Sequence, residues 1–199
     1  EMCIRDRLFA AHWTEGYADM IQKGIGGKVV RFHVLANSDS EADQTLKLAV
    51  RDRVLQEYGD LLETCTSKEE TLAALKNAQQ EISETAEAEV LAQGYTYPVR
   101  VSLVREEFPF KKYGDLIFPA GVYDALRIEI GEAKGKNWWC VLYPQMCYVD
   151  AAWGYSTEES HVRLQNTLTK EEFLVVSAME QKKVAPKIKC RLVELWGER

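Results

Sequence analysis

The chain has 199 residues, 46% of them hydrophobic, and a formal net charge of −6 from 31 acidic and 25 basic side chains. This length suits one domain with a substantial core. The mixed, mildly acidic composition excludes the basic footprint of a nucleic-acid-binding protein. No apolar run approaches the ~20 residues that a helix needs to span a bilayer.

The N-terminal segment, residues 1–27, is predicted to stand before the main domain. Residues 1–7 fit nothing that follows, and they resemble the translated scar of a sequencing adapter, so they carry no functional argument. A loose apolar face over residues 8–23 predicts a helix. The glycines that follow are expected to end that helix: Gly24, Gly26 and Gly27.

Residues 28–36 alternate between apolar and polar positions, which predicts a strand with one strongly buried face. His33 lies on the more polar face, where a solvated or hydrogen-bonded side chain is expected. The turn that follows consists of Asn37, Ser38, Asp39 and Ser40. Ser38 has capping-box spacing with Glu41, and Asp39 or Ser40 are alternative N-caps. A ligand loop is the other interpretation, but the acidic residues oppose an anion, so capping is favoured.

Two helices are predicted next. Apolar residues recur every three or four positions from Ala42 to Leu61, which indicates an amphipathic helix. Ser67 and Glu70 have the spacing that opens a second helix, whose apolar stripe continues to Val90. Gly94 is expected just after its end.

The pattern then changes to strands around residues 99–103, 126–130 and 138–143. The turn-rich residues 131–137 predict a hairpin between the last two strands, and residues 109–121 an excursion with its own short pairing. A helix from Thr169 to about Gln181 and a closing strand, Ile188 to Leu192, complete the order. We therefore predict one α+β domain over residues 28–199, with helices packed on one face of a mainly antiparallel sheet.

Candidate chemistry is sparse. His12, His33 and His161 are far apart and no cysteine pair has zinc-ligand spacing, so neither a metal nor a cofactor is predicted. The alternative to a non-enzymatic protein is a thiol-dependent hydrolase, with a site assembled from Cys140, His33 and Asp39. Cys140 lies in an apolar run, where burial disfavours the thiolate, so this alternative is weak.

Residues 138–147 leave two structural questions open. Cys140 and Cys147 either form a disulfide around Pro144 or remain as two reduced, apolar side chains, depending on the cellular compartment. Trp138 and Trp139 point to opposite faces of a strand. Either both tryptophans serve core packing, or one of them contacts a partner protein.

The sequence resembles the stage II sporulation protein R family of endospore-forming bacteria. The motifs that carry the resemblance are Arg31-Phe32-His33-Val34-Leu35-Ala36-Asn37-Ser38-Asp39-Ser40, Asp43-Gln44 through Arg51-Asp52, Tyr97-Pro98-Val99, Pro119-Ala120-Gly121-x-Tyr123-x-Ala125-Leu126-Arg127 and Gly135-Lys136-Asn137-Trp138-Trp139-Cys140-Val141-Leu142-Tyr143-Pro144. Together they cover most of the chain from about Lys28 to Trp196.

The resemblance implies a signalling protein and no catalytic set, cofactor or small-molecule ligand. Members are exported from the forespore into the intermembrane space, where they trigger the membrane-embedded aspartic protease that matures the precursor of mother-cell sigma factor E. The family's apolar export segment is absent from this chain, as truncation would explain. Export favours the Cys140–Cys147 disulfide. The candidate partner contacts are Trp138, Trp139 and Tyr143.

Overall fold

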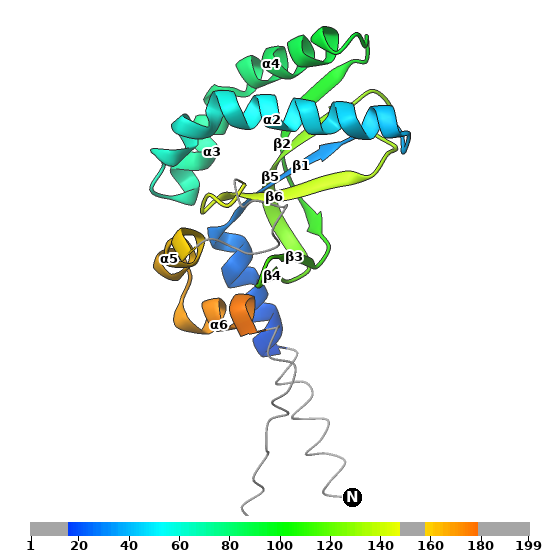
Figure 1. The fold of residues 1–199 in the computed structure, drawn as a ribbon. Helices are drawn as coiled ribbons and strands as arrows, with labels where there is room; N and C mark the ends of the chain where they lie inside the picture. The colour runs from blue at the N-terminus through cyan, green and yellow to red at the C-terminus, as the bar shows by residue number, and fades with distance from the viewer. Residues whose placement is uncertain (1–15, 148–157, 179–199) are drawn as a thin grey trace, which may run out of the picture.

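A mixed sheet of four strands lies at the centre of the computed structural model, which describes residues 16–147 and 158–178. The strands are β1 (Val30–Leu35), β2 (Val99–Phe108), β5 (Gly121–Ile130) and β6 (Asn137–Tyr143), and they lie in the order β2–β5–β1–β6. β1 runs parallel to β5, whereas the β1–β6 and β2–β5 pairs are antiparallel. The predicted α+β class with a mainly antiparallel sheet is confirmed (Figure 1).

The predicted hairpin between β5 and β6 is wrong. These strands are consecutive in the sequence, but β1 lies between them and pairs with both. The reason lies in β1 itself, because both of its faces are buried: Arg31 is 0% exposed and His33 only 3%. A strand buried on both faces belongs in the middle of a sheet, so β5 and β6 take its two sides.

Three helices cover the first face of the sheet: α2 (Glu41–Glu63), α3 (Lys68–Asn77) and α4 (Gln79–Ala92) (Figure 1). The predicted second helix is therefore divided at Ala78. Its apolar stripe nevertheless packs as expected, since Leu75, Ile82 and Val90 share one core cluster with Phe32 and other residues of the sheet. The side chain of Ser67 accepts a hydrogen bond from the backbone of Glu70, which begins α3 at the predicted position.

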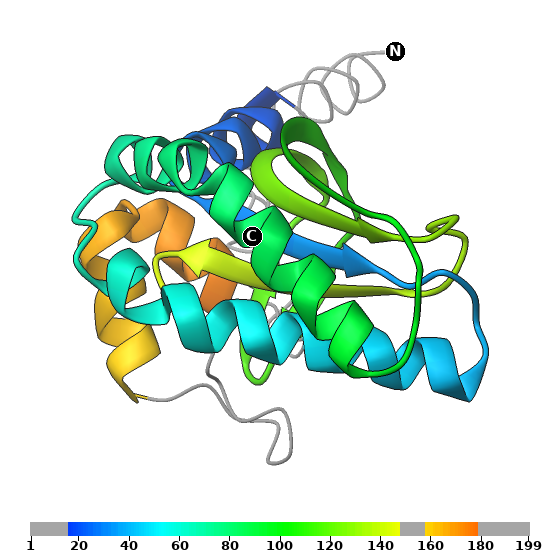
Figure 2. The same cartoon turned by 90° about the horizontal axis from the view of Figure 1, so that it is seen from above.

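A second layer covers part of the opposite face. The prediction that helices pack on only one face of the sheet is therefore wrong. The second layer consists of a helix over residues 16–28, the short hairpin of β3 (Lys111–Tyr113) and β4 (Leu116–Phe118), and the helices α5 (Glu158–Thr167) and α6 (Lys170–Ala178). Figure 2 shows α5 and α6, in orange, toward one end of the sheet. The hairpin confirms the pairing expected within residues 109–121. The alternation of strand side chains explains the second core, because Tyr123, Ala125 and Val141 point away from α2.

The helix over residues 16–28 continues through the glycines that were expected to end it, and it crosses the predicted boundary after residue 27. A Cβ at Gly24 would collide with the carboxylate of Glu172 on α6. One at Gly26 would lie 2.5 Å from the backbone oxygen of Val122 on β5. These glycines therefore permit close packing of the helix, and Ile25 beside them is fully buried.

The C-terminal elements agree with the sequence only in part. Thr169 begins α6 as predicted, because its Oγ1 accepts from the backbone N–H of Glu172, and the Glu172 carboxylate accepts from that of Thr169. The expected end near Gln181 and the closing strand from Ile188 to Leu192 lie outside the described residues. α5 was not predicted. In the described part of the chain no helix is both long and apolar enough to cross a membrane.

Candidate functional site

Residues 37–40 join the start of α2 to the β5–β6 connection. Ser40 is the N-cap of α2, and its side chain accepts from the backbone N–H of Asp43 at 3.2 Å. Asn37 Oδ1 accepts from the backbone N–H of Glu132 at 3.0 Å, and Asp39 Oδ1 accepts from that of Lys136 at 2.7 Å. The loop therefore fixes the connection across the end of the sheet.

The buried carboxylate of Asp43 completes this arrangement. Asn37 Nδ2 and the hydroxyl of Ser38 both donate to Asp43 Oδ2. These hydrogen bonds, that of Ser38 foremost, hold the pKa of Asp43 below its ordinary value. The polar groups of the loop thus serve capping, which is the favoured interpretation of the sequence, and also anchoring of the connection, which the sequence did not predict.

Cys140 lies in the middle of β6, and Cys147 lies beyond the turn that follows the strand. Their sulfurs are joined in the structure, and their Cα atoms are 5.5 Å apart, inside the usual range for a disulfide. Cys65 is free. The remaining cysteines, Cys3 and Cys190, lie outside the described residues.

The thiol-dependent site is not assembled. Cys140 belongs to the core cluster beneath α2, whereas the ring of His33 lies on the other face of the sheet, stacked on Trp139. Asp39 is bound to the backbone of Lys136 at the end of the sheet. Because the Cys140 sulfur is bonded to that of Cys147, it also cannot form the thiolate that a nucleophile requires. The structure therefore contradicts this alternative.

The two tryptophans of β6 point to opposite faces, as the period of a strand requires, and both are half-buried. Trp138 packs on the first core, with the guanidinium of Arg51 from α2 4.8 Å from its ring centre. Trp139 packs on the second, with the ammonium of Lys111 from β3 5.4 Å from its ring centre. Their role in partner contact stays a prediction.

A buried arginine is the main feature that the sequence did not reveal. The guanidinium of Arg31 lies within 5.5 Å of the ring centres of Phe108, Tyr113, Phe118 and Tyr123. It donates one hydrogen bond, of 2.8 Å, to the hydroxyl of Tyr113. Burial lowers the pKa of Arg31. The alternation of β1 predicted a polar face for this residue. Its burial could not be predicted, because the rings that enclose it come from distant parts of the chain.

His33 lies beside this cage and is also buried. Its Nε2 is 2.7 Å from Glu106 Oε1, but the contact is not aligned as a hydrogen bond. Glu106 also pairs with Arg127. Burial, and then the positive charges of Arg127 and Arg31, lower the pKa of His33 to about 4, so the imidazole is neutral at physiological pH.

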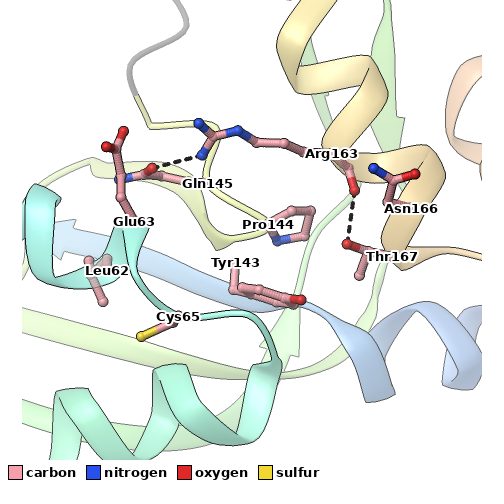
Figure 3. Close-up of a pocket in the computed structure, with 9 residues that line it drawn as sticks. All are labelled: Leu62, Glu63, Cys65, Tyr143, Pro144, Gln145, Arg163, Asn166 and Thr167. Atoms are coloured by element: carbon pink, nitrogen blue, oxygen red, sulfur yellow. Dashed lines mark hydrogen bonds between the residues drawn. The ribbon is translucent and has the colours of Figure 1, made fainter.

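A cleft of about 260 Å³ separates the C-terminal end of α2 from α5 (Figure 3). Tyr143, the third candidate contact, lines it, and its hydroxyl donates to the backbone oxygen of Thr66 at 2.7 Å. Gln145 bridges the two walls, because it donates to the backbone of Gly59 and accepts from Arg163. The residues that line the cleft are Leu62, Glu63, Cys65, Tyr143, Pro144, Gln145, Arg163, Asn166 and Thr167.

Comparison with known proteins decides the family. The sequence profile of the family described as stage II sporulation protein R matches residues 26–153. Stage II sporulation protein R of Bacillus subtilis (strain 168) is 32% identical over 180 residues, which cover 85% of this chain and 80% of that protein. The chain belongs to the stage II sporulation protein R family. The predicted membership is thereby confirmed.

The region that matches the stage II sporulation protein R profile contains all the strands from β1 to β6, the loop 37–40 and both joined cysteines. α5 and α6 follow it. No solved structure matches this family member significantly. Across residues 16–147 and 158–178, no group of three or more His, Cys, Asp or Glu side chains is placed to hold a metal ion.

Proposed function

We propose that this protein is an exported sporulation signal that acts by protein–protein contact. In this proposal it reaches the space between the forespore and mother-cell membranes, and there it triggers the membrane-embedded aspartic protease that matures the precursor of sigma factor E. The observation that carries the proposal is the match to stage II sporulation protein R over most of the chain.

Two features of the structure support this proposal. Cys140 and Cys147 have the separation of a disulfide, which persists in oxidising, exported environments and is rare in the cytosol. The candidate nucleophile Cys140, base His33 and acid Asp39 lie in different parts of the structure. This separation favours a role in recognition over catalysis by these three residues.

Co-reconstitution tests the proposed function. The protease and the sigma precursor would be incorporated with their natural orientation in liposomes, and the purified protein added to the face that corresponds to the intermembrane space. We expect cleavage of the precursor to depend on the added protein and to vanish when a catalytic aspartate of the protease is replaced. Precursor cleavage that is equal with and without the protein would contradict the proposal.

A further inference from the structure

The central sheet has two edges, formed by β2 and β6, and they differ in character. Charged side chains lie toward both ends of β2: Arg100, Arg105, Glu106 and Glu107. Gln79 on α4 also donates a hydrogen bond to the backbone oxygen of Val101 at 3.0 Å. Edge charges and a covering helix are devices that prevent a sheet edge from accepting another strand.

The β6 edge lacks these charges. Its sequence from Asn137 to Tyr143 is uncharged and largely apolar. The backbone N–H of Met146 donates to the oxygen of Val141, so the returning turn occupies the far end of the strand. Nothing among residues 16–147 and 158–178 pairs with the outer side of residues 137–140. An apolar edge with unpaired backbone groups is a template for strand addition.

Positively charged side chains lie beside residues 137–140 on both faces of the sheet. Arg51 lies over Trp138 on the α2 side, and Lys111 lies over Trp139 on the side of the β3–β4 hairpin. Lys47 donates to the backbone oxygen of Lys136, just before the strand begins. Arg51, whose side chain is 19% exposed, also pairs with Asp52 at 2.6 Å, and because that carboxylate is 64% exposed, solvent weakens the pairing.

We propose that the β6 edge, residues 137–140, binds an extended acidic segment of the partner protease as an added strand. Side chains of a strand alternate between faces, so successive carboxylates of the segment would meet Lys111 on one face and Arg51 on the other. A second copy of this chain fits less well. Antiparallel pairing of β6 with itself would bring two Lys111 side chains together on one face. The inference rests on the proposed function.

Charge reversal in the reconstituted cleavage assay tests the electrostatic part. We expect Arg51→Glu and Lys111→Glu each to raise the protein concentration needed for half-maximal cleavage roughly tenfold, because each would repel the acidic segment. Arg53→Glu controls for the change in net charge. Arg53 lies on the same helix, pairs with Glu57 and has a 45% exposed side chain, so its reversal should leave activation unchanged.

Photo-crosslinking tests the location independently of stability. A benzoylphenylalanine in place of Asn137 should crosslink to the protease in the liposomes, whereas the same group in place of Arg100 on the opposite edge should not. If the wild-type protein fails to trigger cleavage, the proposed function itself fails. If it triggers cleavage but position 137 gives no crosslink, or crosslinks two copies of this chain, the edge inference is overturned and the proposed function stands. Unaltered activation by both charge-reversal variants also overturns it.

Discussion

The Cys140–Cys147 pair makes a quantitative prediction about stability. The two residues are separated by seven positions and close a short loop at the end of β6. In the chain-entropy treatment, a crosslink over a loop of this size restricts the unfolded chain enough to stabilise the folded state by about 2–2.5 kcal/mol. Typical urea dependences of ~1–3 kcal/mol per molar convert this into a midpoint shift of about 0.7–2.5 M.

Equilibrium unfolding in urea, followed by tryptophan fluorescence, measures this shift. We expect a reducing agent to lower the midpoint of the wild-type protein by that amount. Cys147→Ser should unfold at the midpoint of the reduced wild type and should not respond to the reductant. Cys65→Ser is the matched control, because Cys65 is free, and it should behave as the wild type does under both conditions.

The reasoning is refuted by either of two results. One is a midpoint that is the same with and without reductant. The other is mass spectrometry of the folded, air-oxidised protein in which Cys140 and Cys147 are both alkylated without prior reduction.

Three further predictions concern individual polar side chains. Because the pKa of His33 is about 4 in the folded protein and ordinarily 6.5, the unfolded chain binds the extra proton first. The contribution of His33 to the free energy of unfolding should therefore be nearly constant above pH 6.5 and fall by about 3 kcal/mol as the pH is lowered to 4. His33→Gln should reduce the slope of stability against pH in this range, and an equal slope in the variant would rule out His33 as its source. Tyr113→Phe removes the hydrogen-bond acceptor of Arg31 and should lower the free energy of unfolding in urea by about 1–3 kcal/mol. An unchanged urea midpoint would count against a role for this bond. Ser40→Ala removes the N-cap of α2 and should cost about 1 kcal/mol, whereas a loss no larger than experimental error would show that the cap is dispensable.

Features set by neighbouring residues were predictable. The starts of α3 and α6 follow from Ser67 with Glu70 and from Thr169 with Glu172, because a capping box needs only four consecutive positions. The opposite orientations of Trp138 and Trp139 follow from the period of a strand.

Features that depend on distant parts of the chain were not predictable. The hairpin between β5 and β6 was expected because nearby strands usually pair, yet β1, far earlier in the sequence, separates them. The burial of Arg31 depends on rings from β2, β5 and the β3–β4 hairpin, and none of these is its neighbour in sequence. Gly24 and Gly26 have the composition of a helix end, but the surfaces packed against them determine their role.

The position of β1 has a consequence for the order in which the protein folds. β1 is made early, but its partners come late: Val30 pairs with Asp124, and Val34 pairs with Trp138. A growing chain therefore cannot pair β1 until β5 has been synthesised, and contacts between such distant residues form slowly. A chain that stays open for this long can pass through a narrow translocation channel before it folds. The topology thus suits the export that we propose, with folding completed on the far side of the membrane.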